Sequence, residues 1–420
     1  MIGKGSPQNL LTETEVHDLV SEFVERERLS GKRVLAIIPD NTRSAPIGLF
    51  FRVLYGLVAR QPGGLDFLIA LGTHPPMTEG AIDLRLGLSP GERATRYPNA
   101  RVFNHHWRDP DQLRLVGTIP AERVAEMSHG MMDDPVPVSI NRLVFDYDVL
   151  LIIGPTFPHE VVGFSGGNKC LFPGISGQEI IDMFHWLGAL ITSPAIIGKK
   201  QTAVRSVVDA AAAMVTVPRL CMSLVVREEG LAGLFCGPPE EAWSAAADLS
   251  EKVHIHHTSR AFRRILSCAP PMYDDLWVGA KAAYKLEPVV ADGGELIVYA
   301  PHIREISVTH GALIRSVGYH VRDYFLKQKD RFTHIPGGVL AHATHLKGVG
   351  TFTDSREHPR INVILATGIT EKTCREVNLG YQNPEDIDPE HWMNREEEGI
   401  LYVPKAGEIL YRQKNDPFAS

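Results

Sequence analysis

Near-continuous runs of apolar residues recur in the N-terminal half of the chain. They span 33–38 (RVLAII), 65–71 (LDFLIAL) and 148–153 (DVLLII). Near-continuous apolar runs of this length predict strands that are covered on both faces of a parallel sheet. The segment 47–60 between the first two runs has the length and the apolar content of a crossover helix. The pattern therefore predicts an α/β fold.

Polar, ionisable residues follow each of these runs directly. The segments are 39–46 (PDNTRSAP), 71–78 (LGTHPPMT) and 154–169 (GPTFPHEVVGFSGGNK). In open α/β sheets the ligand crevice lies beyond the carboxyl ends of the strands. We therefore expect one site to be formed by Asp40, Arg43, His74, His159 and Lys169.

A second α/β pattern follows a stretch rich in proline and acidic residues near 266–275. It predicts a strand at 294–300, a helix at 309–328, a strand at 361–368 and a hairpin at 400–412. A chain of 420 residues also exceeds what one hydrophobic core usually supports. We predict two α/β (Rossmann-like) domains, 1–268 and 269–420, with the active site in the cleft between them.

The composition narrows the possible functions. The formal net charge of −7 argues against a nucleic-acid-binding protein, because phosphate recognition needs a basic surface. The cysteines are odd in number and widely spaced, without a C-x-x-C pair, which argues against disulfides and a structural zinc site. No stretch approaches the roughly 20 apolar residues of a membrane span, and the N-terminus lacks the apolar core of a signal peptide. We expect a soluble, cytoplasmic protein.

The loop at 165–169 (SGGNK) combines two glycines with a lysine. Such a loop can present backbone N–H groups to a phosphate, and the lysine adds positive charge. An ordinary structural turn accounts for the sequence of this segment equally well. A helix with an apolar stripe at Ile180, Phe184 and Leu187 is expected next, and it carries His185.

Two of the 18 histidines stand out. His74 and His159 each lie just beyond a predicted strand and next to a proline, which restricts the backbone and helps to fix the direction of the ring. The clusters at 105–107, 254–257 and 342–345 lack a spacing that implies a metal site. We expect these clusters to have surface or packing roles.

The motifs PDNTR (39–43), GTHPPMT (72–78) and PHEVVGFSGGNK (158–169), followed by His185, resemble those of the lactate racemase family in content and in order. The resemblance covers most of the first 190 residues, with a further correspondence around 270–300. It implies a racemase or epimerase that inverts C2 of a 2-hydroxy acid by proton-coupled hydride transfer. It also implies a nickel-pincer nucleotide as cofactor, the Ni(II) pyridinium-3,5-bisthiocarboxylic acid mononucleotide, which other enzymes synthesise.

The resemblance assigns roles to the matching residues. His74 and His159 correspond to the two acid/base histidines, one for each stereoisomer. Lys169 corresponds to the lysine that is joined covalently to a thiocarbonyl group of the cofactor, and His185 to the protein ligand of the nickel. Arg43 corresponds to a residue that holds the substrate carboxylate. The full set implied for cofactor binding is Asp40, Asn41, Thr42, Arg43, Ser165, Gly166, Gly167, Lys169 and His185.

The second predicted domain, which the resemblance assigns to substrate contacts, departs from the family pattern. Members specific for lactate carry Tyr-Gln and then a lysine three residues after the glutamine, whereas this chain has Trp277, Val278 and Lys281. Val278 cannot hydrogen-bond through its side chain as a glutamine would. We therefore expect these residues to contact a 2-hydroxy acid other than lactate, with packing at the domain interface as the alternative for Trp277 and Val278.

Two other functions fit parts of the pattern. A zinc-dependent hydrolase or lyase would use His74, His159 and His185 with Asp40 as direct ligands of one ion. A non-catalytic nucleotide- or sugar-acid-binding protein would use the glycine loop and Arg43. The predicted partners are the small-molecule substrate and the enzymes that make the cofactor. Neither nucleic acid nor a membrane is expected as a partner. The sequence leaves the oligomeric state open.

Overall fold

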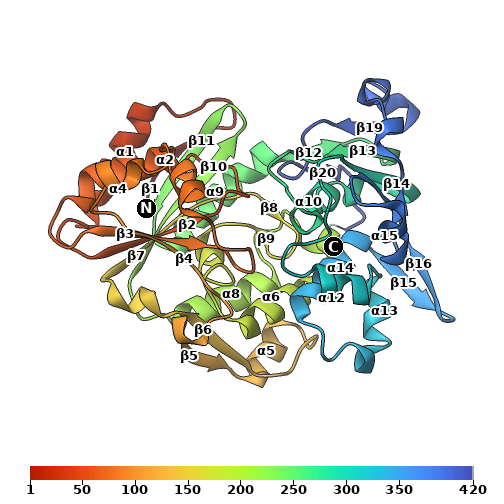
Figure 1. Cartoon of the computed structure of the whole chain (residues 1–420), viewed down its shortest axis with the longest axis horizontal. Helices are drawn as coiled ribbons and strands as arrows, with labels where there is room; N and C mark the ends of the chain where they lie inside the picture. Colours follow the sequence, from red (N-terminus) through yellow and green to blue (C-terminus); the bar gives the residue numbers. More distant parts are fainter. Residues whose placement is uncertain (419–420) are drawn as a thin grey trace. The chain divides into compact units, whose positions relative to one another are not determined.

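The computed structural model describes residues 1–418, and the chain divides into two compact units (Figure 1). Unit 1 comprises Met1–Phe157, Phe164–Ile181 and Arg205–Val253. Unit 2 comprises Pro158–Gly163, Asp182–Val204 and the chain from His254 onward. The predicted α/β class, with parallel sheets and helices, is confirmed. The chain alternates between the units before it reaches His254, whereas the sequence suggested an unbroken first domain up to residue 268.

Unit 1 is built around a seven-stranded sheet with the order β1-β11-β10-β7-β2-β3-β4. Neighbours from β10 to β4 are parallel, and β11 and β1 add antiparallel strands at one edge. In this order the strands span Ile2–Gly5, Gly230–Gly237, Arg219–Arg227, Val149–Pro155, Val34–Pro39, Leu65–Ala70 and Val102–Asn104. The three strands predicted from the apolar runs are confirmed as β2, β3 and β7, which are adjacent in the sheet.

Helices pack against the faces of this sheet (Figure 1). The predicted crossover segment forms α2 (Ile47–Leu54), which continues as a π-helical turn at Tyr55–Ala59. Because side chains alternate along a strand, Val34, Ala36 and Ile38 of β2 face the same way and join the core under α1 and α2. The further elements of this part of the chain are α1 (Glu13–Arg26), α3 (Glu79–Arg85), α4 (Glu92–Arg96), β5 (Leu113–Ile119), α5 (Ala121–Met127), β6 (Val136–Asn141), α8 (Ala203–Ala213) and α9 (Pro239–His254).

Unit 2 contains a five-stranded sheet with the order β18-β17-β14-β13-β19, and every neighbouring pair in it is parallel. In this order the strands span Gly380–Tyr381, Asn362–Thr367, Val290–Ala300, Phe262–Cys268 and Ile400–Val403. The strands predicted at 294–300 and 361–368 are therefore confirmed as β14 and β17. The remaining helices and the antiparallel pair are α6 (Gln178–Ile191, in unit 2 from Asp182 on), α7 (Ser193–Ile196), α10 (Leu276–Gly279), α11 (Lys281–Tyr284), α14 (Gly337–Lys347), α15 (Glu371–Glu376), β15 (Gly350–Thr353) and β16 (Arg356–Pro359).

Two predictions for the second half of the chain are wrong in detail. The helix predicted at 309–328 is divided into α12 (Gly311–Val317) and α13 (Arg322–Leu326), because Gly318 leaves the helical conformation with a φ of +80°. The segment 400–412 does not form a hairpin. Its first strand, β19, pairs with β13, and β20 (Leu410–Gln413) pairs with β12 (Ile255–Thr258), both in parallel.

No helix within residues 1–418 combines the length and the apolar character that a membrane crossing requires.

Candidate active site

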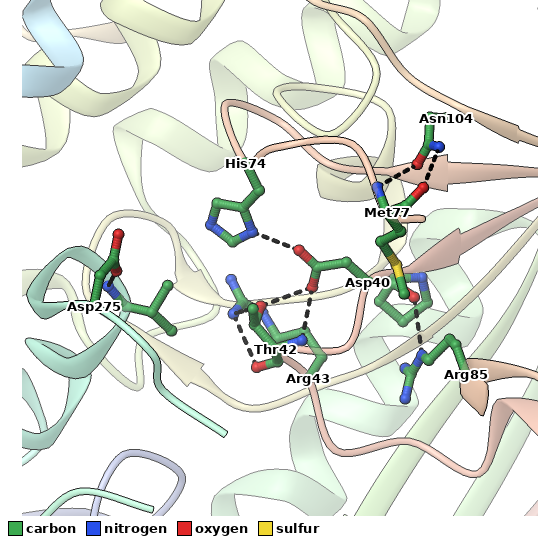
Figure 2. Close-up of polar contacts among 10 residues, drawn as sticks. Asp40, Thr42, Arg43, His74, Met77, Arg85, Asn104 and Asp275 are labelled. Atoms are coloured by element: carbon green, nitrogen blue, oxygen red, sulfur yellow. Dashed lines mark hydrogen bonds and ion pairs between the residues drawn. The ribbon is translucent and has the colours of Figure 1, made fainter. Parts of the chain in front are cut away.

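The turn that follows β2 carries the first group of predicted site residues (Figure 2). Asp40 is the first residue after the strand and is only 4% exposed. Its Oδ1 accepts hydrogen bonds from the backbone N of Thr42 (3.1 Å) and from the Thr42 hydroxyl (2.7 Å). Such a side-chain-to-backbone bond two residues ahead is the reason aspartate favours turns. Arg43 in turn donates from Nη1 to the Thr42 hydroxyl at 3.0 Å, so the three side chains form one network.

His74, which follows β3, joins this network through Asp40. Its Nδ1 lies 2.5 Å from Asp40 Oδ2. Burial would raise the pKa of the Asp40 carboxyl, but His74, Arg43 and Thr42 outweigh this effect and hold the pKa well below its ordinary value. An ionised carboxylate can only accept hydrogen bonds. Asp40 therefore orients the ring of His74, a role that the sequence did not indicate.

Arg85, at the end of α3, is a further residue of this site that the sequence did not indicate. It donates from Nε to the carbonyl of Pro39 at 3.2 Å (Figure 2). It also donates from Nη1 to the carbonyl of Ala45 at 3.3 Å, so it holds both ends of the loop that carries Asp40 and Arg43. Burial lowers the pKa of Arg85 to about 10, while Asp40 acts in the opposite direction. No motif links Arg85 to the loop, because the two contacts join residues 46 and 40 positions apart and only folding creates them.

The glycine loop after β7 is held by other residues of unit 1. Ser165 donates from Oγ to the carbonyl of Pro155 (2.9 Å) and accepts from the backbone N of Phe157 (2.9 Å). Gly167 has a φ of +58°, and a Cβ at this position would lie 2.9 Å from Cβ of Trp243. Trp243 also donates from Nε1 to the carbonyl of Ser165 (2.9 Å). The glycine is therefore required for the close approach of the loop to the tryptophan.

Asn168 and Arg205 also hold this loop in place. Asn168 is buried and donates from Nδ2 to Asp209 Oδ1 (3.0 Å) and Glu240 Oε1 (2.8 Å). The buried guanidinium of Arg205 lies 4.0 Å from the centre of the Trp243 ring, and burial lowers its pKa to about 10. None of these framing residues stood out in the sequence.

Electrostatics place Lys169 and Arg43 in one neighbourhood. Burial raises the pKa of the Cys170 thiol, and the positive charges of Lys169, Arg205 and Arg43 act against this rise. Three cations thus lie within electrostatic reach of one thiol. Within unit 1, Asp40, Thr42, Arg43 and His74 form one hydrogen-bonded network. The convergence of Asp40, Arg43, His74, His159 and Lys169 on one site stays a prediction.

In unit 2, His159 ends the short strand β8 (Pro158–His159). Its Nδ1 accepts a hydrogen bond from the backbone N of Val161 (3.1 Å) and lies 3.7 Å from Glu160 Oε2. Burial would raise the pKa of Glu160, but the charge of Lys285, followed by those of Lys281 and His345, lowers it below the ordinary value. Glu160 is therefore a buried carboxylate beside the predicted acid/base residue, and sequence reasoning missed it.

His185 lies in the part of α6 that belongs to unit 2. Its ring is partly exposed and stands at 79° to the ring of Phe184, with the centroids 4.9 Å apart. The start of α14 lies beside it: Gly338 donates from its backbone N to Asp182 Oδ1 (2.9 Å), and a Cβ on Gly338 would lie 3.9 Å from His185 Nδ1.

Trp277, Val278 and Lys281 lie on α10 and α11 of unit 2. The half-buried ring of Trp277 has its centroid 4.5 Å from that of His310 and 4.4 Å from that of His342. Lys281 Nζ lies 5.1 Å from the centre of the Tyr273 ring. Val278 belongs to the core of unit 2, and its backbone N bonds to Asp275 Oδ1 (3.0 Å). Val278 is therefore buried within unit 2, and both its contact with substrate and its packing at a domain interface stay predictions.

The histidine clusters give no metal site of their own. His105 is buried, with Nε2 3.0 Å from the carbonyl of Ser176 and Nδ1 3.1 Å from Asn141 Nδ2. His342 bonds to the hydroxyls of Tyr284 (3.0 Å) and Tyr319 (3.1 Å). Among residues 1–418, no group of three or more His, Cys, Asp or Glu side chains gathers as metal ligands do. The zinc alternative therefore gains no support.

Comparison with known proteins places these motifs in a family. The family model for the lactate racemase N-terminal domain matches residues 17–196. The curated lactate racemase of Thermoanaerobacterium thermosaccharolyticum is 28% identical over 156 residues, 37% of this chain and 32% of that protein. The N-terminal part of the chain is therefore similar to lactate racemases. The lactate racemase of Lactiplantibacillus plantarum is 23% identical over 193 residues, 46% of this chain and 41% of that protein. The matches thus span about a third to two fifths of these relatives.

Two solved structures share the fold of this chain. A protein from Thermotoga maritima has a TM-score of 0.88 and 33% sequence identity, with 98% of this chain and 100% of that chain covered. The lactate racemase apoprotein from Thermoanaerobacterium thermosaccharolyticum has a TM-score of 0.72 and 18% identity, with 94% and 92% covered. The family model includes Asp40, His74, His159, Lys169 and His185 within its limits, and it ends before Trp277.

Proposed function

We propose that this protein is a racemase or epimerase that inverts the C2 stereocentre of a 2-hydroxy acid by proton-coupled hydride transfer. The similarity of residues 17–196 to the lactate racemase N-terminal domain supports an isomerase. The observation that carries the proposal is the pair formed by His74 and the buried Asp40 beside Arg43. A histidine held by a carboxylate can take up a proton on its other nitrogen, and an adjacent arginine can bind a carboxylate substrate.

The residues of the two units fit the nickel-pincer nucleotide that the family implies. Lys169 and Arg43 supply positive charge for a phosphorylated ligand. A metal that arrives within an organic cofactor needs few protein ligands, and the described residues offer single histidines instead of a cluster. We propose that Lys169 joins the cofactor covalently and that His185 is the nickel ligand. Asp40, Asn41, Thr42, Ser165 and Gly166 complete the proposed binding set. When bound, this cofactor supplies the hydride acceptor.

The protein residues then divide the remaining tasks. Arg43 binds the substrate carboxylate with two parallel hydrogen bonds, which fixes the direction of the C2 hydroxyl. His74, held by Asp40, takes the hydroxyl proton of one stereoisomer. His159 takes the hydroxyl proton of the other stereoisomer, because the hydroxyl points in a different direction when C2 is inverted. Histidine suits both tasks since its pKa allows it to gain and lose a proton near neutral pH.

We further propose that lactate is not the preferred substrate. Trp277 offers a flat ring that is partly exposed, and Val278 offers no hydrogen-bonding side chain. These residues suit a 2-hydroxy acid with a larger side chain, with Lys281 as an additional cation. The proposal also implies partner enzymes that synthesise the cofactor and deliver it to this protein.

The test is stereochemical. Protein that carries the cofactor, as shown by its intact mass and nickel content, is incubated with single stereoisomers of a panel of 2-hydroxy acids and aldonic acids. We expect at least one acid to be converted to its C2 epimer by the parent protein and not by His74→Ala. Fully loaded protein that leaves every acid of the panel unchanged overturns the proposal.

A further inference from the structure

The two histidines of the proposed mechanism have opposite partners at Nδ1. His74 Nδ1 lies 2.5 Å from Asp40 Oδ2, and the ionised carboxylate can only accept a hydrogen bond. His159 Nδ1 lies 3.1 Å from the backbone N of Val161, and a backbone N–H can only donate. In a neutral imidazole one ring nitrogen carries the proton and the other accepts. The partner at Nδ1 therefore decides which ring nitrogen carries the proton.

We infer that neutral His74 carries its proton on Nδ1 and neutral His159 carries its proton on Nε2. His74 then presents an unprotonated Nε2, which can take a proton from a substrate hydroxyl. His159 presents an Nε2–H group, which can only donate until its proton is relocated. The consequence for catalysis rests on the proposed function, whereas the proton positions follow from the geometry alone.

The partner of His74 cannot easily change its role. Asp40 Oδ1 is occupied by the backbone N and the hydroxyl of Thr42, at 3.1 and 2.7 Å, so Oδ2 is the oxygen that faces His74. The carboxyl is buried and its pKa is well below the ordinary value, so it is ionised and an acceptor at neutral pH. The proton on Nδ1 of His74 is therefore fixed.

At His159 the group within hydrogen-bond distance of Nδ1 is a donor, the backbone N–H of Val161. Val161 is buried, and α6 approaches it so closely that a Cβ on Gly188 would lie 2.7 Å from Val161 Cγ1 and 3.2 Å from its Cα. The glycine permits this contact, and the contact holds the turn that aims the N–H of Val161 at the ring. A proton on Nδ1 of His159 would oppose that N–H. The carboxylate of Glu160 has the opposite effect, because it favours a positively charged His159 ring with a proton on Nδ1.

The two stereoisomers should therefore react at different rates in a single turnover. The protein is ready to accept the hydroxyl proton of the stereoisomer that meets His74. The other stereoisomer first requires His159 to take up a proton from water on Nδ1 and to release its Nε2 proton to water, which breaks the hydrogen bond from Val161. In a single turnover with each pure stereoisomer, the one that depends on His74 should react without delay, and the other should show a preceding slow step.

The direct test is NMR on the cofactor-free protein. Long-range ¹H–¹⁵N spectra of ¹⁵N-labelled protein, recorded at a pH where the rings are neutral, distinguish a protonated ring nitrogen from an unprotonated one. His74→Gln and His159→Gln assign the two rings. We expect the proton on Nδ1 in His74 and on Nε2 in His159. The same nitrogen protonated in both rings, or the reverse pattern, overturns the inference. Failure to racemise any acid would overturn the proposed function and leave this result unaffected.

Asp40→Asn gives a sharper version of the test. The Asn carbonyl must replace Oδ1 as the acceptor of the two Thr42 bonds, which turns the amide N–H₂ group toward His74. Nδ1 of His74 then has to accept, so its proton should move to Nε2 while His159 keeps its pattern. A His74 spectrum that keeps the Nδ1 proton in this variant shows that Asp40 does not set the proton position and contradicts the inference.

Discussion

Replacing Arg85 by methionine tests whether the loop after β2 must be held at both ends. The change keeps a side chain of similar length but removes the guanidinium that binds the carbonyls of Pro39 and Ala45. The loop between these carbonyls carries Asp40 and Arg43. We expect a large loss of activity together with a small loss of stability, because the interaction positions functional groups more than it supports the core.

The size of each effect can be estimated from the structure. Both hydrogen bonds are long, at 3.2 and 3.3 Å, so each should contribute near the low end of the ~1.5–3 kcal/mol of a bond to a charged group. In the part of the chain that the structure describes, Arg85 Nη2 is buried without a hydrogen-bond partner, and removing it recovers about 1–3 kcal/mol. The net loss of unfolding free energy is therefore roughly 0–2 kcal/mol. A displacement of the loop by about 1 Å should lower activity on the order of 10²-fold.

Urea unfolding and the turnover of cofactor-loaded protein measure the two effects separately. Arg85→Lys should give an intermediate activity, since an ammonium group reaches at most one of the two carbonyls. Arg101→Met is the matched control: Arg101 pairs with Asp66 at the start of β3, away from the end that leads to His74. It should reduce stability and leave turnover per folded molecule unchanged. If Arg85→Met keeps the parent activity, or loses only what its unfolded fraction explains, Arg85 has no positioning role.

Four further predictions concern the proposed site. Lys169→Ala should keep the fold and lose the covalent cofactor, so a cofactor-sized adduct in its intact mass would contradict the assignment. His185→Ala should retain its helix and release nickel more readily than the parent on dialysis against a chelator; equal retention would make His185 a packing residue. His74→Ala and His159→Ala should each lower steady-state turnover on the order of 10²-fold or more, and each should spare the single-turnover reaction of one stereoisomer. In the folded protein the pKa of Asp40 lies below its ordinary value of 3.8. Its contribution to the free energy of unfolding should therefore be complete above pH 3.8 and decline as the pH falls further. Urea unfolding of the parent and of Asp40→Asn between pH 7 and pH 3 measures this decline.

The sequence by itself determined the class of the fold and the edge of the sheet at which the proposed site lies. Apolar runs without alternation are a local signal of strands covered on both faces, and they identified β2, β3 and β7. The carboxyl ends of parallel strands share one edge, so the positions of Asp40 and His74 in the chain were enough to predict that they meet. They do so at 2.5 Å.

Only the tertiary structure decided how these residues are held. Arg85 donates to Pro39 and Ala45, about forty or more positions away in the chain, and Trp243 donates to Ser165 across an interval of 78. Such contacts leave no periodicity or spacing in the sequence. The division of the predicted helix at Gly318 and the pairing of β20 with β12 have the same origin. A local pattern reports which face of an element is buried, whereas the partner on that face is chosen by the packing of the whole unit. The partners of His74 and His159 at Nδ1, one an acceptor and one a donor, therefore became visible only in the fold.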